Sequence, residues 1–556
     1  ALDLVEGRDP ERLRALLAFS VSSTHGCMTL IDLHTLPPDQ EFQSDLLIVG
    51  AGISGLVLAD ALRGTGRGVD VLEAGGAVLE PESQALYAAE MAGTPHLGTT
   101  EGRFRVYGGS STRWGGQLLP LAPHDFAARP HVSGSGWPIS HADLAPFLAN
   151  CEQLLGVNHS PYISALIEQL PRPRPALSET DLQLRFSKWA PFRCRNVARS
   201  LGRRCQEDPG TRIFLHASVT SIDLHGDGRH VQGVQVRTLT GASFRFRARQ
   251  VVIAAGTIET IRLLLASSRV HNNGIGNHAD HLGRWFHDHL SVKAAILKPL
   301  RRQEFLQRLA PWFLGATRHT LKFESTATWQ ASQGCLNVMG HLVFEAQESS
   351  GFAWLRQQLK ARQSGADQGQ PVRAPHLKQL PAESLDVLYL AWKRLIRHRR
   401  WCPNGADIML YIDTEQQPNP HSRIRLSDTV DALGMPKAVV QWEWGEPERN
   451  ALYGSRKLFI RQWQAWNFGT IVWYESFEPG SNWEASVSDI YHLMGGTRMA
   501  ADPRHGVVDA QLRVHGIDNL FVASCSVFPT GGSSNPTLTL MQLTLRLAEQ
   551  LRKHPA

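Results

Sequence analysis

The sequence predicts an α/β protein with α+β features, in which a discontinuous Rossmann-like domain accompanies a second domain containing an antiparallel sheet flanked by helices. Three observations lead to this prediction. A strand, a glycine-rich turn and a helix stand together at 45–62. Further strand and helix pairs recur at 251–265 and 520–551. Between them, the stretch 285–480 holds many of the fifteen tryptophans and several short strand-like runs.

Composition is that of an ordinary folded chain. The 556 residues are 42% hydrophobic and 19% charged, enough for two or three cores. The 57 basic residues only slightly outnumber the 51 acidic ones, and they are spread along the chain, so nucleic-acid binding is not predicted. Seven cysteines without a Cys-x-x-Cys pattern indicate neither a disulfide framework nor a zinc site. Reduced thiols favour a cytoplasmic location, with a periplasmic one left open.

The first forty residues are interpreted as an N-terminal extension, 1–40, part of which can be helical. The apolar run at 15–21 is similar to the core of a signal peptide, but no Ala-x-Ala cleavage site follows it. The chain starts without methionine and carries one at Met28, so residues 1–27 can be partly foreign to the native protein or a product of processing. No apolar run reaches the length of a membrane span.

The first domain begins with a dinucleotide fingerprint. A strand at 45–49 runs into Gly50-Ala51-Gly52-Ile53-Ser54-Gly55, and helical spacing follows to residue 62. Gly50 permits the tight turn, Gly52 lets the backbone approach a pyrophosphate, and Gly55 lets the helix pack on the strand. A second apolar run at 69–72 ends in Glu73, which is placed to accept hydrogen bonds from ribose hydroxyls. Its position near the N-terminus favours FAD over NAD, although the spacing alone does not separate the two.

Two later segments of the chain are predicted to belong to the same domain. A strand at 251–255 reaches Gly256 and is followed by a helix at 257–265. Before it, 212–223 and 233–247 alternate like antiparallel strands around a turn at 226–228. The last pieces are a strand at 520–523 and a helix at 537–551. The predicted FAD-binding domain therefore comprises 41–284, with substrate-domain insertions around 130–200, and the C-terminal return 485–556.

The second domain is predicted over 285–484 and is assigned to substrate binding. Strands are expected at 406–413, 422–427 and 438–444. Residues 361–382 are rich in Gln, Pro and Gly and predict a surface loop. An amphipathic helix is expected at 385–400, ending in several Lys and Arg residues. Such cations usually match the helix dipole and remain solvated, while peripheral contact with a membrane surface or a partner is the alternative.

Together these motifs resemble the glucose-methanol-choline (GMC) family of FAD-dependent oxidoreductases from about residue 44 to residue 552. Beside the fingerprint, the resemblance rests on the stretch Gly108-Gly109-Ser110-Ser111-Thr112-Arg113-Trp114-Gly115-Gly116, the strand ending at Gly256, and Leu282-Gly283-Arg284 with Asp288-His289. It also rests on the C-terminal block from His492-Leu493-Met494-Gly495-Gly496 to Asn535-Pro536-Thr537. This block is most similar to the branch of pyranose oxidases and bacterial sugar dehydrogenases.

The resemblance implies an FAD cofactor. Pyranose oxidases link their flavin to a histidine where this chain has Arg113, so non-covalent binding is expected. Many members carry Asp where this chain has Ser524, so contact there is expected to be weaker or made by backbone. The predicted cofactor-contacting residues are Gly50, Gly52, Ile53, Ser54, Gly55, Glu73, Ala74, Arg105, Gly109, Ser110, Ser111, Arg113, Trp114, Gly115, Gly116, Val219, Ala255, Gly256, Ser524, Asn535, Pro536 and Thr537.

The resemblance also assigns the chemistry to two residues. Oxidising an alcohol requires a base for the hydroxyl proton, and His492 fits because imidazole titrates near neutrality. Asn535 is expected to hydrogen-bond the reacting hydroxyl, although Asn before Pro536 is also a typical helix N-cap. In either case the positive end of the following helix can stabilise negative charge on the reduced flavin.

Several other residues have two readings. Asp288 and His289 form a family signature that is expected to serve structure at the domain junction. Tyr491, Trp473 and Tyr474 could line a sugar-stacking pocket, with a tryptophan-rich core as the alternative. No metal ligand set is predicted.

The predicted function is FAD-dependent oxidation of a CH–OH group of a sugar, glycoside or related polyol, with hydride transfer to flavin N5. Oxygen, a quinone or a cytochrome would reoxidise the flavin, and a dehydrogenase is preferred to an oxidase. A lyase or decarboxylase on the same scaffold, with a non-redox flavin, is one alternative. A non-catalytic FAD-binding subunit is another.

Overall fold

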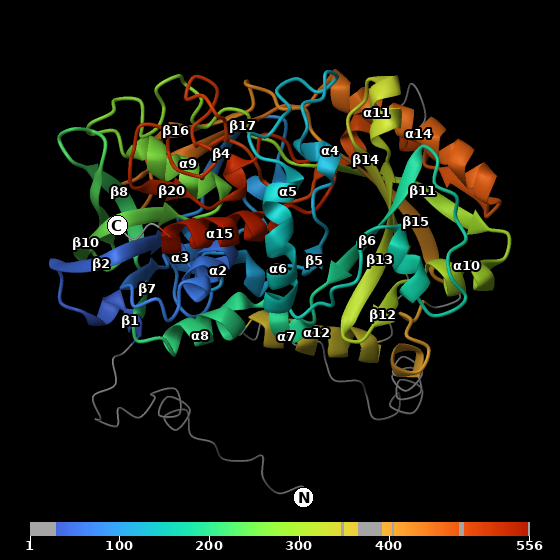
Figure 1. The fold of residues 1–556 in the computed structure, drawn as a ribbon, viewed down its shortest axis with the longest axis horizontal. Helices are drawn as coiled ribbons and strands as arrows, with labels where there is room; N and C mark the ends of the chain where they lie inside the picture. The colour runs from blue at the N-terminus through green and yellow to red at the C-terminus, as the bar shows by residue number, and fades with distance from the viewer. Residues whose placement is uncertain (1–28, 346–349, 365–391, 403–404, 478–482, 554–556) are drawn as a thin grey trace, which may run out of the picture.

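The computed structural model describes residues 29–345, 350–364, 392–402, 405–477 and 483–553. Two domains lie side by side, one coloured mainly blue, green and red and the other yellow and orange (Figure 1). Each domain is built on its own large sheet, so the predicted α/β class with a second, sheet-containing domain is confirmed. None of the described helices has the length and apolar character that crossing a membrane requires.

The first domain is built on an eight-stranded sheet. Its parallel strands lie in the order β1-β7-β3-β2-β10, and β20 also pairs with β10 in parallel. On the other side of β10, β9 and then β8 extend the sheet as antiparallel strands. Helices α2, α9 and α15 belong to this domain, and α15 packs against α2. The bounds are β1 Leu30–Asp32, β2 Gln40–Val49, β3 Val69–Leu72, β7 Thr211–Leu215, β8 Ser218–Leu224, β9 Val231–Arg237, β10 Ser243–Ile253, β20 Leu520–Val522, α2 Ile53–Ala61, α9 Thr257–Ala266 and α15 Pro536–Lys553.

Three boundaries in this domain differ from the sequence prediction. Strand β1 lies inside the predicted extension 1–40, whose residues 1–28 fall outside the described part. The run 212–223 is two strands, because His216 has φ 54° and turns the chain from parallel β7 into β8. The run 233–247 likewise contains the end of β9 and the start of β10, separated by a turn with Gly241 at φ 90°.

The second domain is built on a nine-stranded sheet ordered β18-β11-β15-β14-β13-β6-β5, with β12 on β13 and β19 on β11. Its register pairs are all antiparallel. Helix α14, which the sequence analysis missed, packs against β14, β15 and β18. The bounds are β5 Gln117–Leu118, β6 Leu182–Trp189, β11 Leu290–Pro299, β12 Trp312–Leu314, β13 Thr317–Ser325, β14 Val338–Glu345, β15 Asp407–Thr414, β18 Gly469–Trp473, β19 Val487–Asp489 and α14 Glu446–Trp466.

A third, small sheet, in the order β16-β17-β4, packs on the first domain and shares its hydrophobic core. The strands expected at 422–427 and 438–444 lie here, at Arg423–Val430 and Pro436–Trp442, and not in the large sheet. Their partner β4, Ala89–Gly93, comes from the first domain and pairs with β17 in parallel. Helix α9 packs against β16 and β17, and Arg262 on that helix donates to the carbonyl of Pro436 at 2.6 Å.

The predicted surface loop 361–382 begins as helix. Helix α12 runs from Ser350 to Ser364, and residues 365–391 fall outside the described part. Gln363 near its end is buried and donates to the carbonyl oxygens of Ser111 and Trp114. The prediction of an exposed loop is therefore wrong for 361–364, because this segment covers the stretch 111–114.

The predicted basic helix 385–400 also ends early. Its described residues are helical only at 392–395. Arg399 is buried and donates to the carbonyls of Ala310 and Pro173, so the expectation of solvated cations is wrong for it. Leu395 and Ile396 are exposed, and docking through this segment stays a prediction. If deletion of this segment changes neither membrane association nor turnover, the docking prediction is wrong.

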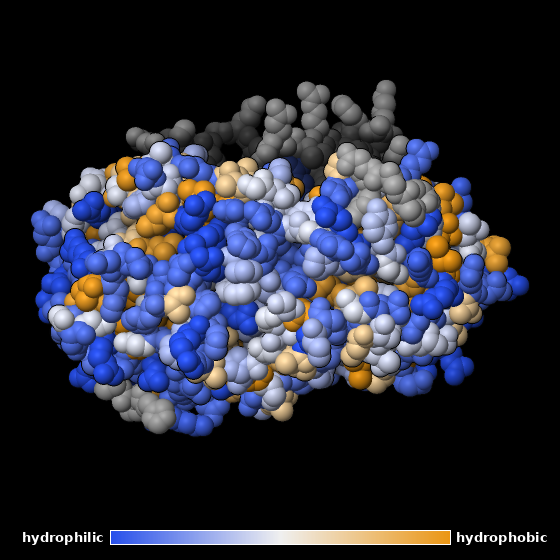
Figure 2. Space-filling view, turned by 90° about the horizontal axis from the view of Figure 1, so that it is seen from above, coloured by the Kyte–Doolittle hydropathy of each residue, from blue (hydrophilic) through white to orange (hydrophobic). Residues whose placement is uncertain are grey.

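Seen from above, the described surface is predominantly hydrophilic, with apolar residues in small separate groups (Figure 2).

The remaining helices are short. The bounds of these helices are α3 Pro81–Ala85, α4 Pro123–Phe126, α5 His141–Leu144, α6 Leu148–Leu154, α7 Phe192–Arg195, α8 Arg203–Gln206, α10 Arg302–Leu309 and α11 Ala327–Gln333.

Candidate functional site

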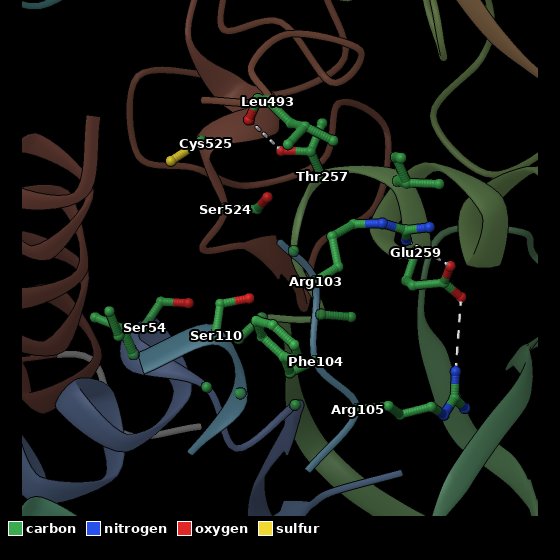
Figure 3. A pocket seen from close by; sticks show the side chains of 18 of the residues that line it. Ser54, Arg103, Phe104, Arg105, Ser110, Thr257, Glu259, Leu493, Ser524 and Cys525 are labelled. Carbon is green, nitrogen blue, oxygen red and sulfur yellow. Dashed lines mark hydrogen bonds and ion pairs between the residues drawn. The ribbon is translucent and has the colours of Figure 1, made fainter. Parts of the chain in front are cut away.

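A pocket opens where the parallel strands β2, β3 and β10 end, the place where doubly wound sheets bind ligands (Figure 3). The first residues of three helices line it: Ile53 of α2, Thr257 of α9 and Pro536 of α15. Helix N-termini carry unpaired N–H groups and a positive dipole end. The pocket is therefore suited to a ligand that carries negative charge.

The fingerprint glycines have the spatial roles that their spacing predicted. Gly50 has φ 108°, and a Cβ there would lie 2.5 Å from the carbonyl oxygen of Ala254. A Cβ on Gly55 would lie 1.9 Å from the carbonyl oxygen of Gly50, so α2 could not pack on β2. A Cβ on Gly52 would meet no protein atom within 4 Å. The space beside Gly52 is therefore free for a ligand to approach the backbone.

Glu73 lies at the end of β3 and is buried. Its carboxylate accepts hydrogen bonds from the backbone N–H of Ala51 at 3.1 Å and of Gly75 at 3.0 Å. Burial raises its pKa to about 7, against the opposing effect of these N–H groups. Arg103 and Arg105 stand nearby, with the Tyr87 ring 4.6 and 5.2 Å from their guanidinium carbons (Figure 3). This part of the pocket thus offers both a carboxylate and cations.

Most predicted cofactor-contacting residues line this pocket. Those that do are Gly50, Gly52, Ile53, Ser54, Glu73, Ala74, Arg105, Gly109, Ser110, Ser111, Val219, Ala255, Gly256, Ser524, Pro536 and Thr537. Those that do not are Gly55, Arg113, Trp114, Gly115, Gly116 and Asn535. These residues and the open space beside Gly52 fit the diphosphate and ribose of FAD, which is the cofactor the sequence predicted.

The exceptions have visible causes. Gly55 packs against the turn at Gly50. Trp114 donates from its indole nitrogen to the carbonyl of Arg195 at 2.9 Å, and the guanidinium of Arg113 lies 4.7 Å from the Phe104 ring. A Cβ on Gly115 would meet Trp189, and one on Gly116 would meet the Arg195 side chain. The stretch 113–116 therefore turns toward the 189–195 segment.

His492 lines the pocket, and Asn535, which does not, contacts the His492 ring. The amide nitrogen of Asn535 is 3.1 Å from His492 Nε2, and His492 Nδ1 is 2.8 Å from His289 Nδ1. As oriented, the Asn535 N–H donates to Nε2, so Nε2 carries the lone pair of the neutral ring and Asn535 occupies it in this structure. The Asn535 side chain is thus aimed at the imidazole.

The backbone of His492 is held by Asp288. Its Oδ1 atom accepts from the N–H groups of His492 at 2.9 Å and His289 at 2.6 Å. Its Oδ2 atom is 3.3 Å from His96 Nε2, and all these groups except His492 are almost fully buried. The sequence analysis placed Asp288 and His289 at the domain junction only. In the structure they contact His492 directly. The Asp-His signature was the only sequence feature noted that pointed to these two residues.

Enclosure lowers the pKa of His492 well below its ordinary value of 6.5, and the neighbouring His289 lowers it further. Lys322 acts in the same direction, while Asp413 opposes it. His492 is therefore held as the neutral imidazole. Lys322 lies on β13 and Asp413 on β15, and the sequence analysis found neither, because no motif marks them.

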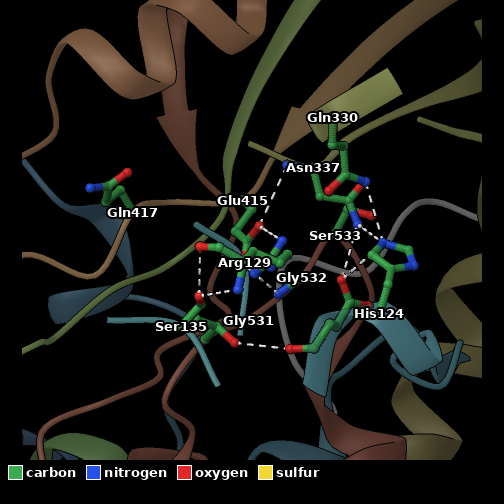
Figure 4. Close-up of polar contacts among 12 residues, drawn as sticks. His124, Arg129, Ser135, Gln330, Asn337, Glu415, Gln417, Gly531, Gly532 and Ser533 are labelled. Carbon is green, nitrogen blue, oxygen red and sulfur yellow. Dashed lines mark hydrogen bonds and ion pairs between the residues drawn. The ribbon is translucent and has the colours of Figure 1, made fainter. Parts of the chain in front are cut away.

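A buried ionic cluster fixes the loop that leads to Asn535 (Figure 4). Arg129 forms two hydrogen bonds to Glu415, at 2.7 and 2.6 Å, and Glu415 accepts from the N–H of Gly532 at 3.1 Å. Glu324 accepts from Ser533 at 2.9 Å. Burial opposes ionisation of Glu415, but Arg129 keeps its pKa below the ordinary value. The cluster ties the C-terminal loop to the second domain.

Of the three aromatic residues predicted for a sugar pocket, only Tyr491 lines this one. It is 44% exposed, has φ 63°, and its hydroxyl donates to Glu101 at 3.1 Å. Trp473 stacks on Phe477, and Tyr474 lies beside Lys293.

The six described cysteines are free thiols.

Known proteins match the chain along most of its length. Residues 418–544 match the GMC oxidoreductase family and 45–270 the FAD dependent oxidoreductase family. The fructose dehydrogenase large subunit of Gluconobacter japonicus is 25% identical over 92% of this chain and 98% of that protein. Paromamine 6'-oxidase of Streptomyces fradiae is 24% identical over 91% and 90%.

The fold has solved counterparts. The crystal structure of pyridoxine 4-oxidase from Mesorbium loti superposes with a TM-score of 0.53 at 18% identity, covering 92% of this chain and 99% of that one. A structure of formate oxidase from Aspergillus oryzae gives a TM-score of 0.53 at 17% identity, with 93% and 99% covered.

Proposed function

Because this chain is an FAD-dependent oxidoreductase of the GMC family, we propose that it oxidises a CH–OH group of a sugar, glycoside or related polyol to a carbonyl. The observation that carries the proposal is that His492, which Asn535 contacts, lines the same pocket as the dinucleotide fingerprint. The names of two relatives support the substrate class, since one acts on fructose and another on the amino sugar paromamine.

The residues divide the work as follows. Bound FAD supplies the acceptor for the hydride at its N5 position. Gly52, Glu73 and the N-terminus of α2 hold its diphosphate and ribose. His492 takes the hydroxyl proton at Nε2, and Asn535 orients the same hydroxyl. The N-terminus of α15 places its positive dipole end in the same pocket, where negative charge develops.

The test is an anaerobic screen of sugars, glycosides, amino sugars and simple alcohols against the isolated holoenzyme, followed by flavin absorbance. Bleaching by a sugar or polyol is expected. If a compound is consumed while the flavin stays oxidised, the chain is a lyase or decarboxylase on this scaffold. If no compound is consumed, it is a non-catalytic FAD-binding subunit.

We further propose that FAD is bound without a covalent link, since Arg113 stands at the position of the flavin-linked histidine and packs on Phe104. Acid precipitation should then release the flavin into the supernatant, whereas flavin in the pellet would refute this.

The preferred acceptor is a quinone or cytochrome, because two relatives are named dehydrogenases. Oxygen consumption that matches substrate turnover would make the enzyme an oxidase.

Asn535→Asp should slow flavin reduction more than Asn535→Ser does, by about tenfold or more, which corresponds to about 1.4 kcal/mol. The aspartate would add a negative charge beside the flavin, which opposes arrival of the hydride. Stopped-flow reduction of the two variants gives the comparison. Equal rates would assign Asn535 to helix capping instead.

The rate of flavin reduction should stay level between about pH 8 and pH 6. A general base works when it is neutral, and enclosure lowers the pKa of His492 well below 6.5. Loss of activity should therefore begin at a lower pH than it would for free imidazole. Reduction rates of the holoenzyme across this range test the prediction, and a fall with its midpoint at or above pH 6.5 contradicts it.

A further inference from the structure

The strand register places a group of polar side chains on the face of the nine-stranded sheet that leads to His492. Side chains alternate along a strand, so Ser291 on β11 shares a face with His289, which contacts His492. Ser291 is paired with Asp413 on β15. In the adjoining row, Lys322, His341 and Tyr411 are paired across β13, β14 and β15.

These five residues form one connected cluster, here called the polar wall: Ser291, Lys322, His341, Tyr411 and Asp413. Ser291 donates to Asp413 Oδ1 at 2.7 Å, and Asp413 Oδ2 is 3.0 Å from His341 Nδ1. The same Oδ2 is 3.9 Å from Lys322 Nζ. The rings of His341 and Tyr411 are stacked, with centroids 5.5 Å apart and planes at 21°.

Lys322 is the member that packing within the protein leaves unsatisfied. Its residue is 6% exposed, yet 3.9 Å to Asp413 exceeds hydrogen-bonding distance. Among the hydrogen bonds of the described residues, none involves its ammonium, which can donate three. An ammonium that is largely enclosed and lacks a protein acceptor is stabilised when a water or ligand oxygen reaches it. A hydroxyl oxygen can accept from Lys322 while its O–H donates to Asp413.

We propose that the polar wall binds the hydroxyl groups of a polyhydroxylated, uncharged substrate next to the carbon that is oxidised; this rests on the proposed function. Lys322 would attract an acid but Asp413 would repel it, and the reverse holds for an amine. A neutral hydroxyl can hydrogen-bond to both. The stacked pair His341 and Tyr411 offers an apolar ring face of the kind on which sugar C–H groups pack. A monohydric alcohol leaves Lys322 without an acceptor and gains nothing from the polar wall.

The test compares Lys322→Met with Lys298→Met as holoenzymes. Lys298 is a matched control because it is also a lysine of this sheet, but it is exposed and pairs with Thr470 of β18, far along β11 from Ser291. The probes are D-fructose, D-glucose, methyl β-D-glucoside and D-glucosamine, with 1-propanol as the monohydric comparison. KM and kcat come from anaerobic flavin reduction, and thermal melting checks folding.

In Lys322→Met the KM for the reactive sugars should rise about 10- to 100-fold while kcat changes less, as for loss of a binding contact. The KM for 1-propanol and all constants of Lys298→Met should stay unchanged, and Lys322→Arg should restore part of the sugar affinity. An unchanged sugar KM in folded Lys322→Met overturns the inference, and so does an equal rise for 1-propanol, while the proposed function stands.

If no probe bleaches the wild-type flavin, the proposed function fails, and calorimetric titration of the same sugars into wild-type holoenzyme then decides the inference separately. Binding that is present in the wild type and lost in Lys322→Met supports the polar wall. Absence of binding, or equal binding by both proteins, overturns it.

Discussion

His492→Ala should keep its FAD and lose roughly 10²- to 10⁴-fold in the rate of flavin reduction by substrate, the range typical for removal of a general base. His492 Nε2 is the lone-pair position that Asn535 faces, and the backbone of His492 is held by Asp288 whichever side chain it carries. The substitution therefore removes the base without removing its scaffold. Flavin content and stopped-flow reduction are the two measurements.

His421→Ala is the control for this variant, because His421 is an exposed histidine on a loop of the second domain. Its reduction rate should equal that of the wild type. A His492→Ala enzyme that turns over at a near-normal rate would rule out His492 as the base. Loss of flavin together with activity would instead show that His492 supports the fold of the pocket.

Arg129→Met should lower the free energy of unfolding by about 3–5 kcal/mol, because it leaves the Glu415 carboxylate buried without its cation. Both side chains of the pair are nearly inaccessible, at 6% and 0% exposure. Glu415 also accepts from Gly532, so the loop that carries Asn535 should loosen at the same time. Urea unfolding of the holoenzyme measures the loss.

Two further variants separate this effect from a general loss of packing. Arg129→Met combined with Glu415→Leu should recover part of the stability, since paired apolar residues need no counter-charge although the Gly532 N–H loses its acceptor. Arg203→Met should change it by less than about 1 kcal/mol, because the Arg203–Glu207 pair is 79% and 60% exposed. A loss below about 1 kcal/mol for Arg129→Met alone would mean that Glu415 finds another partner.

The sequence was informative where a short segment carries both the structure and the chemistry. Gly50, Gly52 and Gly55 specify their turn by local sterics alone, and the strands and helices beside them were predicted closely. The proximity of His492 to Asn535 followed from the family resemblance. The placement of residues that belong to recognisable motifs could thus be predicted before the fold was known, while their roles stay predictions.

Features that depend on pairing between distant strands were missed. Lys322, His341 and Asp413 meet only because β13, β14 and β15 align in one register, and nothing in each strand alone records that alignment. The turn at His216 was missed because its left-handed conformation is set by tertiary context. Gln363 was placed in a loop because the polar composition that follows it resembles one.

The small sheet fixes a late segment of the chain on the first domain. Strand β17, Pro436–Trp442, is paired in parallel with β4, Ala89–Gly93, so residues more than three hundred positions apart share one ladder. The buried side chains of β16 and β17 belong to the same hydrophobic core as the fingerprint strand and its helix. Without residues 423–442, β4 would lose its partner strand and α9 would lose two of the strands against which it packs. Separately expressed halves of the chain are therefore not expected to assemble the site.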